Sequence, residues 1–575
     1  MRSLIVCAYL VACTENVQLA PDPLGNLVTI ELSPNDATLT IDDLSQPSQT
    51  LAYHAIGVFS DGSRRDITAM LSWLVDNPAP GSFLEAGTYT TSNIAAGHVG
   101  VTARSSDGVV ATAALTVVVD AVVIDPAFPP SDPDLFDPSN VVIAGDPTHA
   151  PAFVYPSDGT EMPQGVAGTL FQATLGAGND TLEITFDADL LHLTILTAAD
   201  RWDTGNQVQQ LLALSSIGTP IQVGIAAASS LAAGTVYGGT SIAIDFDAEQ
   251  PGGLLYFWSA ATNGIMLGTL GAASAPKLYP GDATCVGCHA VSRDGLGMSM
   301  GLGSESAPLL QAISTTTLAP AIDSSQGIAG GWSTYSPDGS LILVADDGQL
   351  VLRDAQTGAP VSAAGSGGKI ALPSGHFATH PDWSPDGASV AVAYTATQPT
   401  NLDVAGASIA VLPYNGDGTF GTPLVLVAPV GSDNDYFPRY SPDGSYLAYV
   451  HASEPSQGAA SAELWLVRSG GGTPIALDEA SHTVGSVTAV PGLADTMPSW
   501  APVTSTHAFL AFASARAYGT VLPAAGRPQI WISAIDLTSP MPGADPSQPA
   551  FWLPCQDVTV LNMSPVWAVD TSTPQ

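Results

Sequence analysis

The sequence predicts an all-β protein, and both its composition and its repeats support this. Its 575 residues include 57 glycines and 46 prolines, with many valines and threonines and few lysines, which is typical of strands joined by tight turns. Apolar residues make up 45% of the chain, too many for a disordered protein. A turn-and-strand unit recurs over the C-terminal half, which indicates a repeated β architecture. A chain of this length needs more than one core, so we expect three or four domains.

The charge of the chain argues against nucleic acid and against an anionic lipid surface as partners. Thirteen Lys and Arg residues stand against 52 Asp and Glu residues, a formal net charge of −39. Such a chain lacks the positive charge that neutralises phosphates. Only 11% of the residues are charged, so we expect a surface built mainly from uncharged polar side chains.

Residues 1–13 predict export. A positive end, Met-Arg-Ser, precedes an apolar run to Ala12 that is too short to cross a bilayer. The run ends in Leu-Val-Ala-Cys13, which resembles the lipobox of bacterial lipoprotein signal peptides. The resemblance implies that Cys13 is diacylated and becomes the mature N-terminus. Thr14 after it favours the outer membrane, and residues 14–26 then form a tether. An ordinary secretory peptide and a misassigned start codon are the alternatives.

Residues 27–120 predict a small β-sandwich, because apolar residues alternate along several short segments. The middle of this region reads Phe-Ser-Asp-Gly-Ser at 59–63 and Asp-Ile-Thr at 66–68, followed by Trp73. This pattern resembles bacterial Ig-like domains of the Big2 type. The Asp61-Gly62 pair predicts a hairpin turn, and Trp73 is expected in the core of the sandwich.

Two further segments precede the repeats. Residues 121–150 contain six prolines and five aspartates, which predicts a stiff, solvated linker. A Ca²⁺ site is the alternative, but the spacing of a calcium loop, with its fixed Gly and final Glu, is missing. Residues 151–272 again show alternating strands and end with Leu-Leu-Tyr-Phe-Trp at 254–258. They resemble an Ig-like or fibronectin-III-like sandwich.

One turn recurs in the remainder of the chain. It reads Ser-Arg-Asp-Gly at 292–295 and Ser-Pro-Asp-Gly at 336–339, 384–387 and 441–444, with a degraded copy at 500–503. In such a turn proline fixes φ, aspartate accepts a local amide and glycine takes the positive φ. Each intact Pro-Asp-Gly copy is followed by two apolar strands. The pattern resembles the PD40 (WD40-like) repeat of TolB-type β-propellers.

That resemblance implies a β-propeller over residues 280–575. Five fuller repeats and one orphan first strand at 563–567 predict six blades. We expect the orphan strand to be completed by chain from the N-terminal side of the propeller, which closes the ring and removes its edges. The aspartates of the turns are interpreted as turn formers.

The first repeat carries Cys285-Val-Gly-Cys288-His289, the attachment signature of c-type haem. In this motif the two thiols add to the porphyrin vinyl groups, and His289 places a ring nitrogen on the iron. We therefore expect one covalent haem c. The alternatives are a disulfide, two free thiols, or a zinc site, for which the sequence offers no fourth ligand. Cys555 has no obvious partner and is interpreted as a small buried apolar residue.

The repeat register indicates which residues face the haem from the other blades. The positions seven residues before each turn glycine, or aligned with them, are Cys288, Trp332, His380, Phe437, Met497 and Ser564. We expect these positions near the axis at one mouth of the channel. Met497, then His380, then Met563 are therefore the candidate distal ligands. A methionine ligand raises the reduction potential of a haem.

The combined prediction is a lipid-anchored propeller that transfers electrons in the cell envelope. A redox partner or envelope protein would dock at the propeller mouth, and only the lipid anchor would touch the membrane. The alternative is a TolB-like binding platform without haem, in which Cys285 and Cys288 are structural. Haem enzymology such as peroxide reduction is a third hypothesis, but no acid/base pair near the motif supports it. No catalytic residue is predicted, since no known catalytic motif is present.

Overall fold

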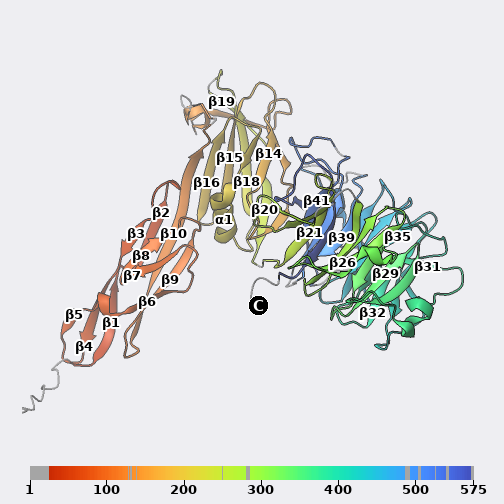
Figure 1. Ribbon diagram of the computed structural model, residues 1–575. Coiled ribbons are helices and arrows are strands. Elements are labelled where there is room, and N and C mark those ends of the chain that lie inside the picture. The colour runs from red at the N-terminus through yellow and green to blue at the C-terminus, as the bar shows by residue number, and fades with distance from the viewer. Residues whose placement is uncertain are drawn as a thin grey trace, which may run out of the picture. The chain divides into compact units, whose positions relative to one another are not determined.

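The computed structural model describes residues 25–126, 128–129, 133–137, 139–232, 234–248, 250–279, 285–485, 492–502, 507–524, 526–538 and 543–570 (Figure 1). The described part is almost entirely β, which confirms the predicted fold class. It forms two compact units. The first contains the residues up to Ile41 together with Ser45–Val118, and the second contains Asp42–Leu44 together with the chain from Val119 onward. The predicted signal peptide, Cys13 and residues 14–24 lie outside the described residues. No helix of the described part is long and apolar enough to cross a membrane.

The first unit is a small β domain built from short strands. Its elements are β1 (Leu27–Ser33), β2 (Asp36–Ile41), β3 (Thr50–Ala52), β4 (His54–Phe59), β5 (Arg64–Asp66), η1 (Thr68–Met70), β6 (Ser72–Val75), β7 (Gly81–Glu85), β8 (Thr88–Thr91), β9 (Gly97–Arg104) and β10 (Val110–Ile124). One sheet has the order β1-β4-β5, another β3-β8-β7, and β2, β10, β9 and β6 pair in a third.

Two local predictions for the first unit can be followed residue by residue. The Asp61-Gly62 pair joins β4 to β5 as a hairpin, with Gly62 at φ 81° and the Ser63 amide donating to the Asp61 carboxylate at 2.8 Å. Trp73 is half-buried, its ring centroid 5.0 Å from that of Phe83, and its indole N–H donates to the Thr68 carbonyl. Trp73 therefore packs at the margin of the core, where its polar edge finds a partner.

The second unit begins with a sandwich. Its elements are η2 (Pro133–Phe136), β11 (Val141–Ala144), β12 (Ala152–Tyr155), β13 (Thr160–Pro163), β14 (Leu170–Thr174), β15 (Thr181–Ala188), β16 (Leu191–Thr197), β17 (Arg201–Asp203), α1 (Gly205–Ser215), β18 (Ile221–Ala228), β19 (Thr235–Gly238) and β20 (Ile242–Asp247). The larger sheet includes β11-β19-β18-β15-β16 and the end of β10, and the smaller is β12-β14-β17. Phe171 of the smaller sheet meets Phe186 of the larger at 5.1 Å between ring centroids, and both are buried.

The prediction of a linker over residues 121–150 is wrong at both of its ends. Residues 119–124 of β10 pair in parallel with β16, and β11 pairs in parallel with β19. The prolines that suggested a linker are concentrated between these two strands. The flanks are rich in valine and isoleucine, so they add to the sheet and satisfy their backbone groups there.

Six sheets follow, each contributing one strand to a ring (Figure 1). In chain order the elements are β21 (Leu254–Ser259), β22 (Gly264–Gly268), β23 (Lys277–Tyr279), β24 (Cys285–Val291), β25 (Gly297–Gly303), β26 (Pro308–Ser314), β27 (Pro320–Ile322), η3 (Ser324–Gln326), β28 (Trp332–Tyr335), β29 (Leu341–Asp346), β30 (Gln349–Asp354), η4 (Ser362–Ala364), η5 (Ser366–Gly368), β31 (Phe377–Trp383), β32 (Ser389–Thr395), β33 (Ser408–Pro413), β34 (Leu424–Val427), β35 (Asn434–Tyr440), β36 (Tyr446–Ala452), β37 (Glu463–Arg468), β38 (Ile475–Ala476), α2 (Asp478–His482), β39 (Thr496–Trp500), β40 (His507–Ser514), β41 (Gln529–Asp536), β42 (Phe551–Trp552) and β43 (Asn562–Ala568).

The six sheets are the six predicted blades. The innermost strands of blades 1 to 6 are β24, β28, β31, β35, β39 and β43, and each contacts the next around the circle, with β43 returning to β24. Blade 6 combines β43 with β21, β22 and β23, so chain from the N-terminal side completes the orphan strand as expected. The predicted C-terminal limit of the second sandwich at residue 272 is therefore wrong. Tyr256 and Ile265 pack with Val286 and Met298 of blade 1, since the ring needs their apolar surface to fill its last gap.

The repeated turn has the chemistry that its residues predict. In each intact copy the serine hydroxyl donates to the aspartate two residues on, at 2.5 Å from Ser292 and Ser441 and 2.6 Å from Ser336 and Ser384. The glycine that follows takes φ between 69° and 76°. Hydrogen bonds from these serines lower the pKa of Asp338 and Asp386, which keeps the turn carboxylates ionised.

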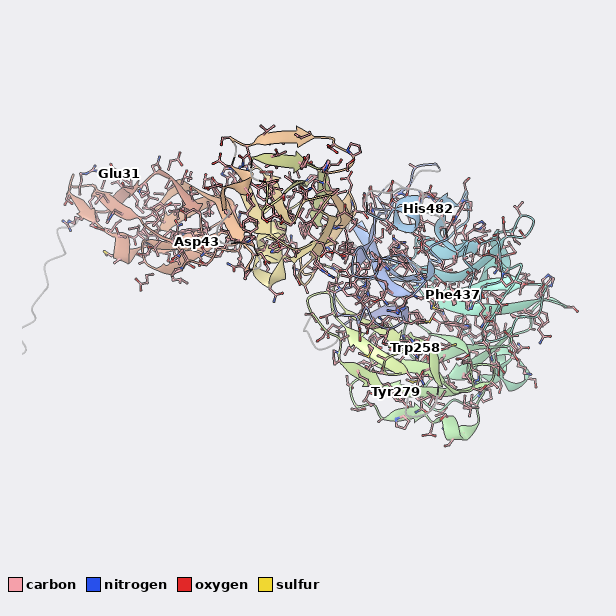
Figure 2. All side chains as sticks on the ribbon, turned by 90° about the horizontal axis from the view of Figure 1, so that it is seen from above. Glu31, Asp43, Trp258, Tyr279, Phe437 and His482 are labelled. Carbon is pink, nitrogen blue, oxygen red and sulfur yellow. The ribbon has the colours of Figure 1, made fainter. Side chains whose placement is uncertain are left out.

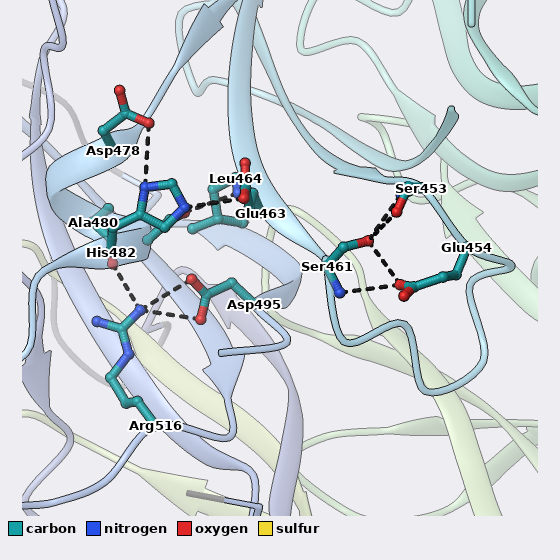
Figure 3. A network of polar contacts seen from close by, with 11 residues as sticks. Ser453, Glu454, Ser461, Glu463, Leu464, Asp478, Ala480, His482, Asp495 and Arg516 are labelled. Carbon is teal, nitrogen blue, oxygen red and sulfur yellow. Dashed lines mark hydrogen bonds and ion pairs between the residues drawn. The ribbon is translucent and has the colours of Figure 1, made fainter. Parts of the chain in front are cut away.

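A buried ion pair ties α2 to blade 5 (Figure 3). The Arg516 guanidinium lies 3.0 Å from the Asp495 carboxylate, and each side chain is only 1% exposed. Arg516 also donates to the carbonyl of Ala480 in α2, and it lies 5.2 Å from the ring centroid of Trp531. Burial raises the pKa of Asp495, so this carboxylate depends on the guanidinium to remain charged.

Replacing Arg516 with Ala should lower the free energy of unfolding by about 3–5 kcal/mol, because Asp495 is then buried without its counter-ion. Arg527→Ala is the matched control, since Arg527 is exposed in the same blade and donates to the carbonyl of Val558. The control should change stability by less than about 0.5 kcal/mol. Equilibrium denaturation measures both, and equal effects would contradict a structural role for the ion pair.

Candidate functional site

The Cys-x-x-Cys-His motif lies on β24, the innermost strand of blade 1. Gly287 pairs with Gly301 and Ala290 with Ser299, so Cys288 and His289 form a bulge between regular stretches of the ladder. Cys288 has φ 51°, a left-handed conformation that costs a non-glycine residue about 1–3 kcal/mol. The side chain of Cys285 lies outside the described residues, although its backbone begins the strand.

The same bulge recurs around the ring. Five of the six positions that the turn register aligns are left-handed, with φ between 50° and 56°: Cys288, His380, Phe437, Met497 and Ser564. The ladder of each of these innermost strands shifts register at that residue. Blade 2 is the exception, since Trp332 pairs regularly with Ala345 and follows a glycine at φ 147°. Counting back from the turn glycines thus identified one structural position in the fold.

Side chains at this position meet across the centre of the ring. The Trp332 and Phe437 ring centroids lie 4.8 Å apart, although blades 2 and 4 are not neighbours. His380 stacks on Phe437 at 3.8 Å and meets the edge of Trp332 at 5.0 Å. On the other side, the Ser564 hydroxyl donates to the Met497 sulfur at 2.9 Å. We call Trp332, His380, Phe437, Met497 and Ser564 the axial layer. Figure 2 labels Phe437 within the propeller.

His289 is buried, and its exposed fraction is 3%. Among the described residues neither of its ring nitrogens has a hydrogen-bond partner of normal geometry. Burial lowers its pKa to about 4, while the backbone of Tyr256 opposes the shift and the charge of Arg439 adds to it. The imidazole is therefore neutral at physiological pH, the form that can ligate a metal.

An apolar cavity of about 200 Å³ borders Cys288, between blades 1 and 6. Its lining residues are Trp258, Val286, Gly287, Cys288, Gly301, Ser304, Glu305, Pro308, Leu402, Met563 and Ser564. Met563, one of the three predicted distal ligands, thus lines the same cavity as Cys288. Met497 and His380 belong to the axial layer instead. His289 does not line this cavity in the described part of the chain.

These residues fit a c-type haem in chemical type. Cys288 borders an apolar cavity, the adjacent imidazole is buried with no hydrogen-bond partner among the described residues, and the thioether residue Met563 borders the same cavity. The cavity is smaller than the roughly 300–1,000 Å³ of pockets that enclose drug-sized ligands, so it accounts for only part of the room that a macrocycle needs.

A second cavity, of about 300 Å³, lies on the axis at the opposite end of the innermost strands. All six blades line it, and its charged residues are Arg293, Asp382 and Arg439. Arg439 lies 3.4 Å from Asp382, and Arg293 donates to the carbonyl of Trp383. Sequence reasoning did not single out these arginines. The available signal was that Arg293 replaces the proline of the other turns in a chain with only 13 basic residues.

Comparison with known proteins shows similarity of fold alone. No family model matches the chain, and no curated protein matches it. Among solved structures it is similar to one described as TolB from Agrobacterium tumefaciens, at 17% identity over 52% of this chain and 88% of that chain, with a TM-score of 0.31. It is similar to TolB from Acinetobacter baumannii at 14% identity over 61% and 80%, with a TM-score of 0.34. A nidogen/laminin complex matches at 11% identity over 55% and 99%, with a TM-score of 0.36.

His289→Leu should stabilise the protein when it is produced without haem attachment, by about 1–3 kcal/mol, because the variant removes a buried polar group that has no hydrogen-bond partner among the described residues. His451→Leu is the control. His451 bonds to the buried Asp435 at 2.8 Å, so the same replacement there should destabilise the protein. Equilibrium denaturation compares the two variants. A loss of more than 1 kcal/mol in His289→Leu would show that the imidazole holds the fold together.

Proposed function

We propose that this protein is an exported six-bladed propeller that carries one c-type haem and transfers electrons in the cell envelope. The observation that carries the proposal is His289, a buried imidazole without a hydrogen-bond partner among the described residues, placed directly after a thiol that borders an apolar cavity. Leaving such a group unpaired costs about 1–3 kcal/mol, and a bound metal ion at the ring nitrogen would offset that cost.

Each residue of the motif has a distinct part in this proposal. The thiols of Cys285 and Cys288 would hold the haem through two thioether links, each made by adding the sulfur and its proton across a vinyl group. His289 supplies the proximal nitrogen, held neutral by burial. When bound, the haem supplies a one-electron iron couple, whose potential depends on the opposite ligand.

Met563 would be the best-placed distal ligand, because it lines the same cavity as Cys288. Met497 and His380 remain candidates in the axial layer. His380 is held between Trp332 and Phe437, and burial together with the charge of Arg439 lowers its pKa well below the usual value. For His380 to reach the iron, the Trp332 and Phe437 rings would have to move apart. Met563 is therefore the better candidate.

In this proposal, a lipid on Cys13 anchors the protein to the outer membrane. The first unit, which resembles Ig-like domains in sequence, and the second sandwich would then act as spacers. A redox partner would dock at the propeller mouth nearer Cys288. The formal charge of −39 favours a partner with a basic docking surface.

A binding platform without haem is the second candidate, and the axial cavity supports it. Two of the 13 basic residues, Arg293 and Arg439, line one cavity of about 300 Å³. Guanidinium groups in a partly desolvated site suit a carboxylate of a ligand or of a protein segment. In that case Cys285 and Cys288 are structural.

Expression of the full chain in a host with a c-type haem maturation system tests the two candidates. We expect a Soret band and a haem that stays attached after denaturation, both lost when Cys285 and Cys288 are replaced by Ser. Cys555→Ser should keep both signals, because Cys555 is buried at 4% exposure away from the motif. A colourless protein with intact cysteines would reject the haem proposal and leave the binding platform.

Carbon monoxide then distinguishes an electron carrier from an open catalytic iron. A six-coordinate haem should resist CO, and Met563→Ala should make it bind CO readily. CO binding by the unaltered protein would indicate an open site and would contradict the proposed distal ligand.

A further inference from the structure

A second group of metal-ligand side chains lies far from the motif, where the second sandwich meets blade 5. Glu161 of β13 and Asp247 of β20 come from the sandwich, and His507 begins β40 of the propeller. One ligand atom from each lies within 4.8 Å of the other two. β13 and β20 are neighbouring parallel strands, and β13 also contacts β41 of the same blade.

The geometry at His507 is convergent, because both carboxylates address the same ring nitrogen. Nδ1 lies 2.8 Å from Glu161 Oε1 and 3.5 Å from Asp247 Oδ2. The second distance exceeds the roughly 2.7–3.2 Å of a normal N–H···O bond. The proton on Nδ1 lies closer to Glu161 than to Asp247, whereas a cation at the centre of the three ligand atoms could be shared by all three groups.

The histidine in α2 offers an instructive contrast (Figure 3). His482 also lies between two carboxylates, but Glu463 is 3.0 Å from Nε2 and Asp478 is 3.4 Å from Nδ1. The two carboxylates are thus on different edges of the ring and cannot meet at one ion. His482 forms two separate ion pairs, and the arrangement at His507 is of a different kind.

Charge and burial at His507 favour a dication. The Glu161 and Asp247 side chains are 10% and 6% exposed, so their ionised forms have lost most of their water. The charges that act on His507, those of Glu161, Asp247 and Asp536, are all negative. A single imidazolium balances only one of them, whereas a divalent ion neutralises the two buried carboxylates that face it.

We propose that Glu161, Asp247 and His507 bind a divalent transition-metal ion that joins the second sandwich to the propeller, with Zn²⁺ as the best match. Zinc accepts imidazole nitrogen together with carboxylate oxygen and is stable with three protein ligands and one water. Calcium and magnesium prefer all-oxygen ligand sets, which the histidine does not provide. The inference does not rest on the proposed haem.

Zinc titration of the untagged full chain tests this, after removal of metals with a chelator. The Cys285→Ser, Cys288→Ser background removes the motif as a competing zinc site. We expect one Zn²⁺ per chain by calorimetry and a higher thermal midpoint in its presence. His507→Gln and Asp247→Asn should each weaken binding at least tenfold, while His482→Gln should leave it unchanged.

Two outcomes would overturn the proposal. One is the absence of zinc binding by a protein that shows its normal thermal midpoint, which would make the cluster an ion pair only. The other is binding that His507→Gln does not weaken although the variant keeps its metal-free midpoint. Cobalt supplies a second measurement, because its visible spectrum should report nitrogen and oxygen ligands in the parent and lose that signal in His507→Gln.

Discussion

The ring depends on the pairing of β43 with β21, which joins the last strand of the propeller to chain that precedes its first repeat. Leu255 pairs with Trp567 and Tyr256 with Val566, so β43 gains a paired neighbour and blade 6 is completed. Without this pairing blade 1 would face solvent, including Val286 and Met298 of its core. His289 on β24 is buried beside this completed blade, close to the backbone of Tyr256.

Two separate cavities lie along the innermost strands of the closed ring. Along β24 the apolar cavity borders residues 286–288 and the axial cavity borders residues 290–293. The axial layer lies at the bulges, where five innermost strands turn one residue into the left-handed region. Strained positions of this kind persist only where the surrounding structure holds them. The layer therefore separates an apolar environment around Cys288 from a charged one around Arg439.

The second sandwich is more than a spacer in physical terms, since it packs on the propeller through polar and aromatic contacts. The hydroxyl of Tyr155 accepts the amide of Trp552, and Gln172 accepts the amide of Thr520. The Tyr155 and Tyr518 rings meet edge to face at 4.9 Å between centroids. With such contacts the two parts behave as one compact unit, in which the group at His507 lies at a joint rather than on a free surface.

The sequence by itself determined what depends on neighbouring residues: the all-β class, the Ser-x-Asp-Gly turns, the six repeats and the register that aligns Cys288 with His380. Those features follow from local turn chemistry and from a unit that recurs along the chain, with four copies that keep the turn. Only the tertiary structure decided which distant segments join. The apolar run of β21 would suit a strand of a sandwich as well as a strand of a blade, so the sequence pattern assigned it to the wrong domain. The convergence of Asp247 with His507 left no trace in the sequence either, because long-range contacts between single residues have no period.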